Sequence, residues 1–166
     1  TEARAAVATF RRLGERWILG ATLGELGRVH QTLGNLDEAE ACYVESLELV
    51  SDADYHGSHF VYSELGRLAS DRGEHRLAAD YHAEALRLAE MDGNVDCVAS
   101  AVAGLAHAAE AKGDTELAIR HYRDAVDSGG TVPLWKHGPE EWRHALDRLT
   151  GDVSGSSART DAPSVD

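Results

Sequence analysis

Apolar and small residues recur along this chain at intervals of three and four, which places them on one face of an α-helix. Polar or glycine-containing breaks separate these stretches, as at 51–54, 91–94 and 129–130. Alanine and leucine dominate the periodic stretches, a composition that favours helix over sheet. The pattern therefore predicts an all-α protein with helices near 2–14, 16–33, 37–50, 56–72, 75–91, 95–112, 115–128 and 139–150.

The central part of the chain repeats itself three times. The copies align on a leucine followed by a small residue, Leu26-Gly27, Leu65-Gly66 and Leu105-Ala106. At fixed distances after this pair come a turn glycine, an alanine, a ring residue and a second small residue. These are Gly34, Gly73 and Gly113; Ala39, Ala78 and Ala118; Tyr43, His82 and Tyr122; and Ser46, Ala85 and Ala125. A helical hairpin of this kind cannot bury its apolar face alone, so the copies must stack on one another.

Each shared residue type has a packing role. The glycine or alanine after the leucine lets the second helix of the hairpin approach closely. The alanine of the second helix does the same from the other side, and the ring four residues later lies on the same face. The turn glycine suits the left-handed conformation that ends many helices. Asn35 and Asp114, which follow two of these glycines, are good caps for the next helix.

In these positions the chain resembles the tetratricopeptide repeat family, whose pattern is W-x2-L-G-x2-Y…A-x3-F…P. The resemblance covers roughly residues 17 to 128. It lacks the tryptophan and the closing proline, and His82 replaces a Phe or Tyr. The matching segments are Leu23-x2-Leu26-Gly27-x2-His30, Tyr62-x2-Leu65-Gly66-x2-Ala69 and Val102-x2-Leu105-Ala106-x2-Ala109, followed by Ala39-x3-Tyr43, Ala78-x3-His82 and Ala118-x3-Tyr122. The resemblance implies a right-handed α–α superhelix. Its long repeat is similar to those of kinesin light chains and of bacterial signalling and regulatory proteins.

We expect one repeat domain over residues 1–150. Residues 2–14 look like the second helix of a preceding repeat, which suggests that the chain is a piece of a longer protein. The three full repeats are expected at about 16–50, 56–91 and 95–128. The apolar stripe of the last helix, at 139–150, suggests a cap over the end of the stack, with a partner-binding helix as the alternative. Residues 151–166 have no periodicity and are expected to be a disordered tail.

The overall charge and composition exclude several classes of protein. The net charge of −13 argues against binding a nucleic-acid backbone, which needs clustered Lys and Arg. No apolar run reaches the length of a membrane span, and no signal peptide is visible. Cys42 and Cys97 lack CxxC spacing, which suggests reduced thiols in a cytoplasmic protein.

Neither a catalytic nor a metal site is predicted. His56-x2-His59 is the one histidine pair at ligand spacing, and neither HExxH nor CxxC accompanies it. His82 is interpreted as a core residue with one hydrogen-bond partner, and a pH switch is the alternative. Because the chain also has no nucleophile elbow and no phosphate loop, we expect neither an enzyme nor a cofactor.

The positive hypothesis concerns the concave face of the stack. There the first helix of each hairpin would present side chains to a partner. Arg28 and Arg67 occupy the same repeat position and His107 follows them, so together they could pair with carboxylates of a peptide. The alternative is that they are ordinary exposed residues. The family's clamp for chaperone carboxyl termini is disfavoured, because Glu25, Glu64 and Gly104 stand in place of its Asn. The predicted contact residues are Arg28, Gln31, Phe60, Ser63, Arg67, Ser70, His107 and Glu110.

The sequence therefore predicts a non-catalytic module that binds a protein or peptide. By resemblance, it would be the sensor or scaffold part of a larger bacterial regulatory protein. The alternative is a self-association module and thus a homo-oligomer. In that case the amino-terminal half-repeat and the cap helix would stack solenoids end to end.

Overall fold

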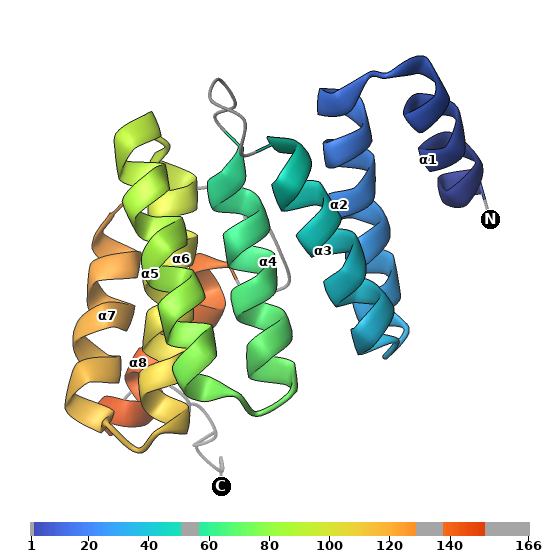
Figure 1. Ribbon diagram of the computed structural model, residues 1–166. Coiled ribbons are helices and arrows are strands. Elements are labelled where there is room, and N and C mark those ends of the chain that lie inside the picture. The colour runs from blue at the N-terminus through green and yellow to red at the C-terminus, as the bar shows by residue number, and fades with distance from the viewer. Residues whose placement is uncertain (1, 51–56, 129–137, 152–166) are drawn as a thin grey trace, which may run out of the picture.

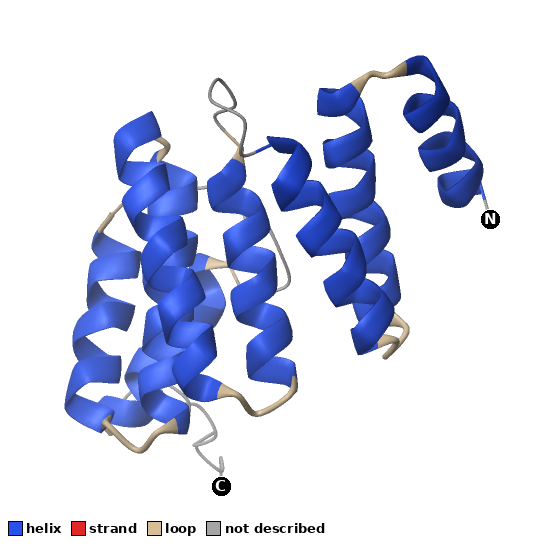
Figure 2. Ribbon diagram, in the orientation of Figure 1, coloured by secondary structure: helices blue, strands red, loops and turns tan. Residues whose placement is uncertain are grey.

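The structure, a computed structural model, describes residues 2–50, 57–128 and 138–151. All regular secondary structure in these ranges is helical (Figure 2). The all-α prediction is therefore confirmed for the described residues. Their eight helices are α1 (Glu2–Leu13), α2 (Arg16–Thr32), α3 (Leu36–Val50), α4 (Ser58–Asp71), α5 (His75–Asp92), α6 (Val95–Ala111), α7 (Thr115–Asp127) and α8 (Pro139–Thr150).

The helices pair into three hairpins, α2 with α3, α4 with α5 and α6 with α7, which follow one another along the molecule (Figure 1). Helix α1 packs on α2 at one end, and α8 packs on α7 at the other. Each hairpin contacts the next one, as a stack of repeats requires. The residues expected to form a disordered tail lie, apart from Gly151, outside the described residues.

The three hairpin turns share one geometry. Gly34, Gly73 and Gly113 have φ of 78°, 77° and 82°, which is the left-handed region predicted for them. In each turn the amide of the next residue donates a hydrogen bond to the carbonyl five residues earlier, at 2.8–3.0 Å. This bond satisfies a carbonyl that the helix end leaves without a partner. The predicted cap also forms at Asp114, whose side chain accepts a hydrogen bond from the Leu117 amide at 3.2 Å.

Within each hairpin, a ring from the second helix lies against a residue with little or no side chain in the first. A Cβ added to Gly27 would lie only 2.6 Å from Cε1 of Tyr43, and one added to Gly66 only 2.7 Å from the ring of His82. In the third hairpin Ala106 takes the glycine position and is fully buried. The close helix approach that the repeat pattern predicts is thus present, and a larger residue at these positions would force the helices apart.

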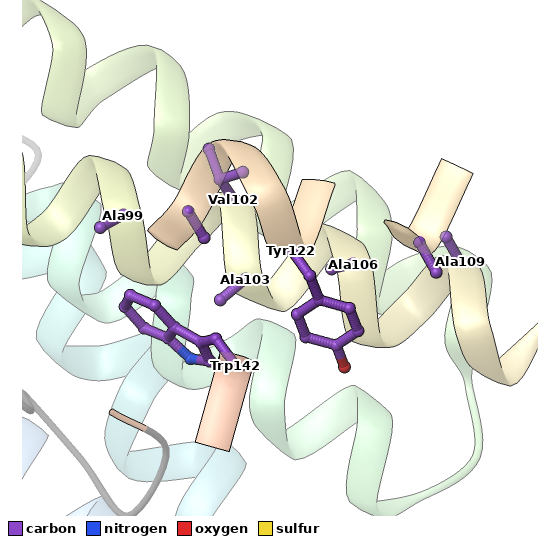
Figure 3. Packing of buried hydrophobic residues seen from close by; sticks show 9 residues of the cluster. Ala99, Val102, Ala103, Ala106, Ala109, Tyr122 and Trp142 are labelled. Carbon is purple, nitrogen blue, oxygen red and sulfur yellow. The ribbon is translucent and has the colours of Figure 1, made fainter. Parts of the chain in front are cut away.

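The hydrophobic core is divided along the stack. One cluster joins α1 to α2, and a second, containing Tyr43 and Leu65, lies between α3 and α4. A third joins α6, α7 and α8, and in it Trp142 lies beside Ala99 and Ala103 (Figure 3). Because α6 presents mainly alanines to this cluster, α8 can bring its large indole close to the α6 backbone.

Replacing Ala78 with Leu should lower the free energy of unfolding by about 1–3 kcal/mol. Ala78 has no exposed surface, so the added atoms would overpack the contact between α4 and α5. Chemical denaturation of the variant beside Ala83→Leu measures this, since Ala83 is exposed on the same helix. Equal stability of the two variants would show that the repeat register is misassigned.

Candidate functional site

A cavity of about 700 Å³ lies on the inner side of the stack. It is bounded by the first helices of all three hairpins, α2, α4 and α6, and by α8. The rings of His82 and Tyr122 reach it from the second helices. Cavities of about 300–1,000 Å³ are typical of ligand sites in proteins. The residues that line it are Arg28, Gln31, Thr32, Ser63, Arg67, Ser70, Asp71, His82, Ser100, Ala103, Gly104, His107, Tyr122, Glu141, Trp142 and Ala145.

Most of the contact residues expected from the sequence lie in this cavity. Those that line it are Arg28, Gln31, Ser63, Arg67, Ser70 and His107. Phe60 does not line it, although it is only half-buried in α4. Glu110 does not line it either: it pairs with Arg148 of α8 at 2.7 Å and accepts a hydrogen bond from the Tyr122 hydroxyl at 3.2 Å. The bond from Arg148 lowers the pKa of the Glu110 carboxyl.

The two cavity arginines have carboxylate partners within the protein. Arg28 pairs with Glu25, one turn earlier on α2. Arg67 donates from Nη1 to both carboxylate oxygens of Glu64, each at 3.1 Å. Both arginines remain partly exposed, at 41% and 30% of their side-chain surface. A carboxylate from a partner would therefore share each guanidinium with an internal carboxylate, which the five donors of the arginine fork permit.

Glu64 is fully buried at the junction of the first and second hairpins. Its Oε2 lies 3.1 Å from the hydroxyl of Tyr43, which is 2.9 Å from Oε1 of Gln31. Gln31 in turn donates to Asp71 at 2.6 Å. The single Tyr43 hydroxyl hydrogen faces two acceptors, and both contacts become hydrogen bonds when Glu64 is protonated. Burial raises the pKa of Glu64 to about 7, although the charge of Arg67 and the Tyr43 hydrogen bond act in the opposite direction.

His82 is a core residue, as predicted, with 3% of its surface exposed. The expectation that it finds a hydrogen-bond partner is wrong for Nδ1, which has none among the described residues. The ring is held between Gly66 of its own hairpin and Gly104 of the next. Burial lowers the pKa of His82 to about 4, and the nearby His107 and Arg67 lower it further. His82 is therefore neutral at neutral pH.

The sequence interpretation missed the wall that α8 contributes. Trp142, which is 5% exposed, and Ala145 belong to the predicted apolar stripe, and both also line the cavity. Helix α8 follows α7 as α4 follows α3, so it takes the place of the first helix of a further repeat. First helices were expected to line the groove. The same rule, applied to the last helix, would have found these residues.

No group of three or more His, Cys, Asp and Glu residues that could hold a metal occurs among the described residues. His56 of the histidine pair lies outside them, and His59 instead contacts Asp92, with Nδ1 3.0 Å from Oδ2. Within the same ranges, no helix is both long enough and apolar enough to cross a membrane.

Stacked helical hairpins with a cavity on the inner face define an α-solenoid of the kind that binds other molecules. Residues 18–91 match a family model described as Tetratricopeptide repeat. Residues 18–91, which hold the first two hairpins, thus match the tetratricopeptide repeat family, and this match supports a protein-interaction module. The resemblance seen in the sequence is confirmed.

Solved structures share this fold. BtubC (BKLC) from P. vanneervenii is 23% identical, with a TM-score of 0.66, over 76% of this chain and 54% of that one. The N-terminal domain of stress-induced protein-1 (STI-1) from C. elegans is 12% identical, with a TM-score of 0.63, over 81% and 97%. The Sgt2 TPR domain from Aspergillus fumigatus is 19% identical, with a TM-score of 0.60, over 89% and 88%. The match thus spans about half the length of BtubC. Among curated proteins, no match is found.

Glu64 should make stability depend on pH in a direction opposite to that of most buried, ion-paired carboxylates. Because its pKa rises from an ordinary 4.5 to about 7 on folding, the folded state favours the protonated form. The stabilisation is complete below about pH 4.5 and is lost as pH rises to about 7. The free energy of unfolding of the wild type, relative to Glu64→Gln, should fall across this window by up to about 3 kcal/mol.

Denaturation of both proteins between pH 4 and about 8 measures this difference. The comparison is needed because His82, with its lowered pKa, gives both proteins a slope of the opposite sign between about 6.5 and 4. Glu38→Gln, at an exposed position of α3, is the matched control. If the difference in free energy of unfolding between wild type and Glu64→Gln does not change with pH, then folding does not raise the pKa of the Glu64 carboxyl.

Proposed function

We propose that this chain is a non-catalytic module that holds a protein or peptide segment in the concave cavity. It would serve as the sensor or scaffold part of a larger bacterial regulatory protein in the cytoplasm. Cys42 and Cys97 are thiols, which is consistent with that compartment. The contacts would come from Arg28, Gln31, Phe60, Ser63, Arg67, Ser70, His107 and Glu110.

The observation that carries this proposal is the continuity of the cavity across the whole stack. It runs from Arg28 on α2 to Trp142 on α8, so one bound segment could touch all three hairpins at once. Its lining changes in character along the way. Polar and charged groups dominate near α2 and α4, whereas Ala103, Tyr122 and Trp142 provide an apolar wall near α6 and α8. A few placed polar groups beside an apolar surface are typical of binding sites.

Phe60 and Glu110 would contribute differently from the other residues. Neither lines the cavity, so they could touch only a segment that extends past its edge. Glu110 also holds α8 through Arg148, so it would act mainly by fixing the position of the Trp142 wall. The direct contacts would therefore come from the six residues that line the cavity.

An Arg28→Glu/His107→Glu variant should lose the bound partner. The exchange reverses the charge at position 28 on α2 and adds a negative charge at position 107 on α6, and neither residue is buried. Arg67 is left unchanged because its removal would leave Glu64 buried beside no opposite charge. Affinity capture from a lysate of the source organism, with wild type and variant side by side, measures the loss.

The matched control is Arg87→Glu/His144→Glu, which makes the same exchanges at exposed positions outside the cavity. A partner retained by wild type and control but lost from the cavity variant supports the proposal. A partner retained equally by all three proteins would place binding on another surface.

Self-association is a second candidate, because large apolar side chains are exposed where α1 joins α2. Leu13 and Trp17 there are 62% and 56% exposed. Such residues, next to the α1 end of the repeat stack, could contact the α8 end of another copy.

Light scattering at two protein concentrations distinguishes the two candidates. A module that binds a separate partner should keep the mass of a monomer at both concentrations. If copies stack, the mass should rise with concentration and return to that of a monomer in Leu13→Ser/Trp17→Ser. A mass that rises equally in this variant would exclude the α1–α2 end as the contact.

A further inference from the structure

The ring residues of the three hairpins differ in how their polar atoms are satisfied. In the first hairpin the Tyr43 hydroxyl donates to Gln31 at 2.9 Å, and in the third the Tyr122 hydroxyl donates to Glu110 at 3.2 Å. Gln31 and Glu110 both stand four residues after the small residue of the first helix. In each case a bond runs from the ring of the second helix to this position of the first.

The second hairpin has His82 and Ser70 at the same two positions. An imidazole is shorter than a phenol, and a serine is shorter than a glutamine or glutamate. The corresponding bond does not form: His82 Nδ1 and Ser70 Oγ are both buried and have no hydrogen-bond partner among the described residues. Both side chains line the cavity. Buried polar groups in proteins are nearly always paired, so Ser70 Oγ and His82 Nδ1 could each form a hydrogen bond with a ligand.

The neighbouring hairpin cannot supply the missing partner. In the first hairpin the ring also reaches Glu64 of the next repeat, but the equivalent residue for His82 is Gly104. A Cβ on Gly104 would lie 2.4–2.6 Å from Nδ1, Cε1 and Cγ of His82, and one on Gly66 would lie 2.7–2.8 Å from Cε1, Nε2 and Cδ2. These near-equal distances put a glycine over each face of the ring. Only the edge of the imidazole, which carries its nitrogen atoms, is left for a hydrogen bond.

The charges around the cavity favour a neutral ligand group at this place. Arg28 and Arg67 each have an internal carboxylate partner, and Asp71 and Glu141 add negative charge to the lining. A carboxylate buried beside Ser70 would have to share Arg67 with Glu64, and the charges of Asp71 and Glu141 would oppose it. A carboxamide carries no charge, and it offers a donor and an acceptor together. It fits either tautomer of a neutral His82, because the Ser70 hydroxyl can rotate to donate or to accept.

We propose that Ser70 and His82 form a subsite for a carboxamide group of the bound partner, such as the side chain of an asparagine or glutamine. The inference rests on the proposed function, since it names one group that the cavity would recognise. The partner's amide would replace the bond that Gln31 and Glu110 make in the other two hairpins. Recognition at the centre of the cavity would thus depend on hydrogen bonds and not on ion pairs.

Three small probes of similar shape test this: butyramide, butyrate and 2-pentanone, added at millimolar concentration to the full chain labelled with ¹⁵N. The readout is the pair of His82 imidazole nitrogen resonances, which report on hydrogen bonding at the ring. Butyramide should shift them, and butyrate and pentanone should not. Ser70→Ala should weaken the butyramide response about fivefold, the value of about one net hydrogen bond. Ser100→Ala removes a hydroxyl from the same cavity and should leave the response unchanged.

Equal or stronger shifts with butyrate would overturn the inference, as would His82 resonances that no probe moves. A butyramide response that survives intact in Ser70→Ala would overturn it as well. None of these outcomes bears on whether the cavity binds a partner at all, because the Arg28→Glu/His107→Glu capture experiment decides that separately. A cavity that captures a partner but ignores butyramide would keep the proposed function and lose only this subsite.

Discussion

The structure depends on the contact between a ring and a residue that has almost no side chain. Tyr43 lies on Gly27, and His82 lies between Gly66 and Gly104, at distances that leave no room for a Cβ. These contacts set how closely the two helices of a hairpin approach. For His82 they also set how closely one hairpin approaches the next. The width of the inner cavity follows from these spacings, because the same first helices form its floor.

Burying a ring with polar atoms creates a second requirement, which is a partner for those atoms. The hairpins meet it to different extents. Tyr43 has two oxygen partners, one of them on the next hairpin, and Tyr122 has one, which also holds α8 through Arg148. His82 has none for Nδ1 among the described residues. The three similar repeats therefore differ chemically at the ring position. Of the three ring residues, His82 is the one with a buried polar atom that has no hydrogen-bond partner among the described residues.

Much of this architecture could be read from the sequence, because it follows from spacing along one helix. The positions of Ala39, Ala78 and Ala118, the turn glycines and the rings are all local, and periodicity reveals them. The surroundings of Glu64 and His82 could not be predicted from the sequence, because they depend on which residue of the next hairpin lies opposite the ring. Glu64 reads as an exposed helix carboxylate until Tyr43 is placed over it. The contribution of α8 to the cavity was missed for a related reason: a cap was expected to cover the end of the stack, not to line its inner face.

The contact between Tyr43 and Glu64 also limits how this array could grow or shrink by duplication. Repeats are commonly regarded as units that can be copied or deleted one at a time. Here the second helix of one unit and the first helix of the next form a matched pair, Tyr43 with Glu64 and His82 with Gly104. If a copy of the first unit were placed after the second, its first helix would bring a glutamate to the His82 ring. The tyrosine of its second helix would then lie opposite Gly104 and lack its glutamate. The unit that can be exchanged without damage is therefore the junction, which runs from one second helix to the following first helix, and not the hairpin that the sequence pattern outlines.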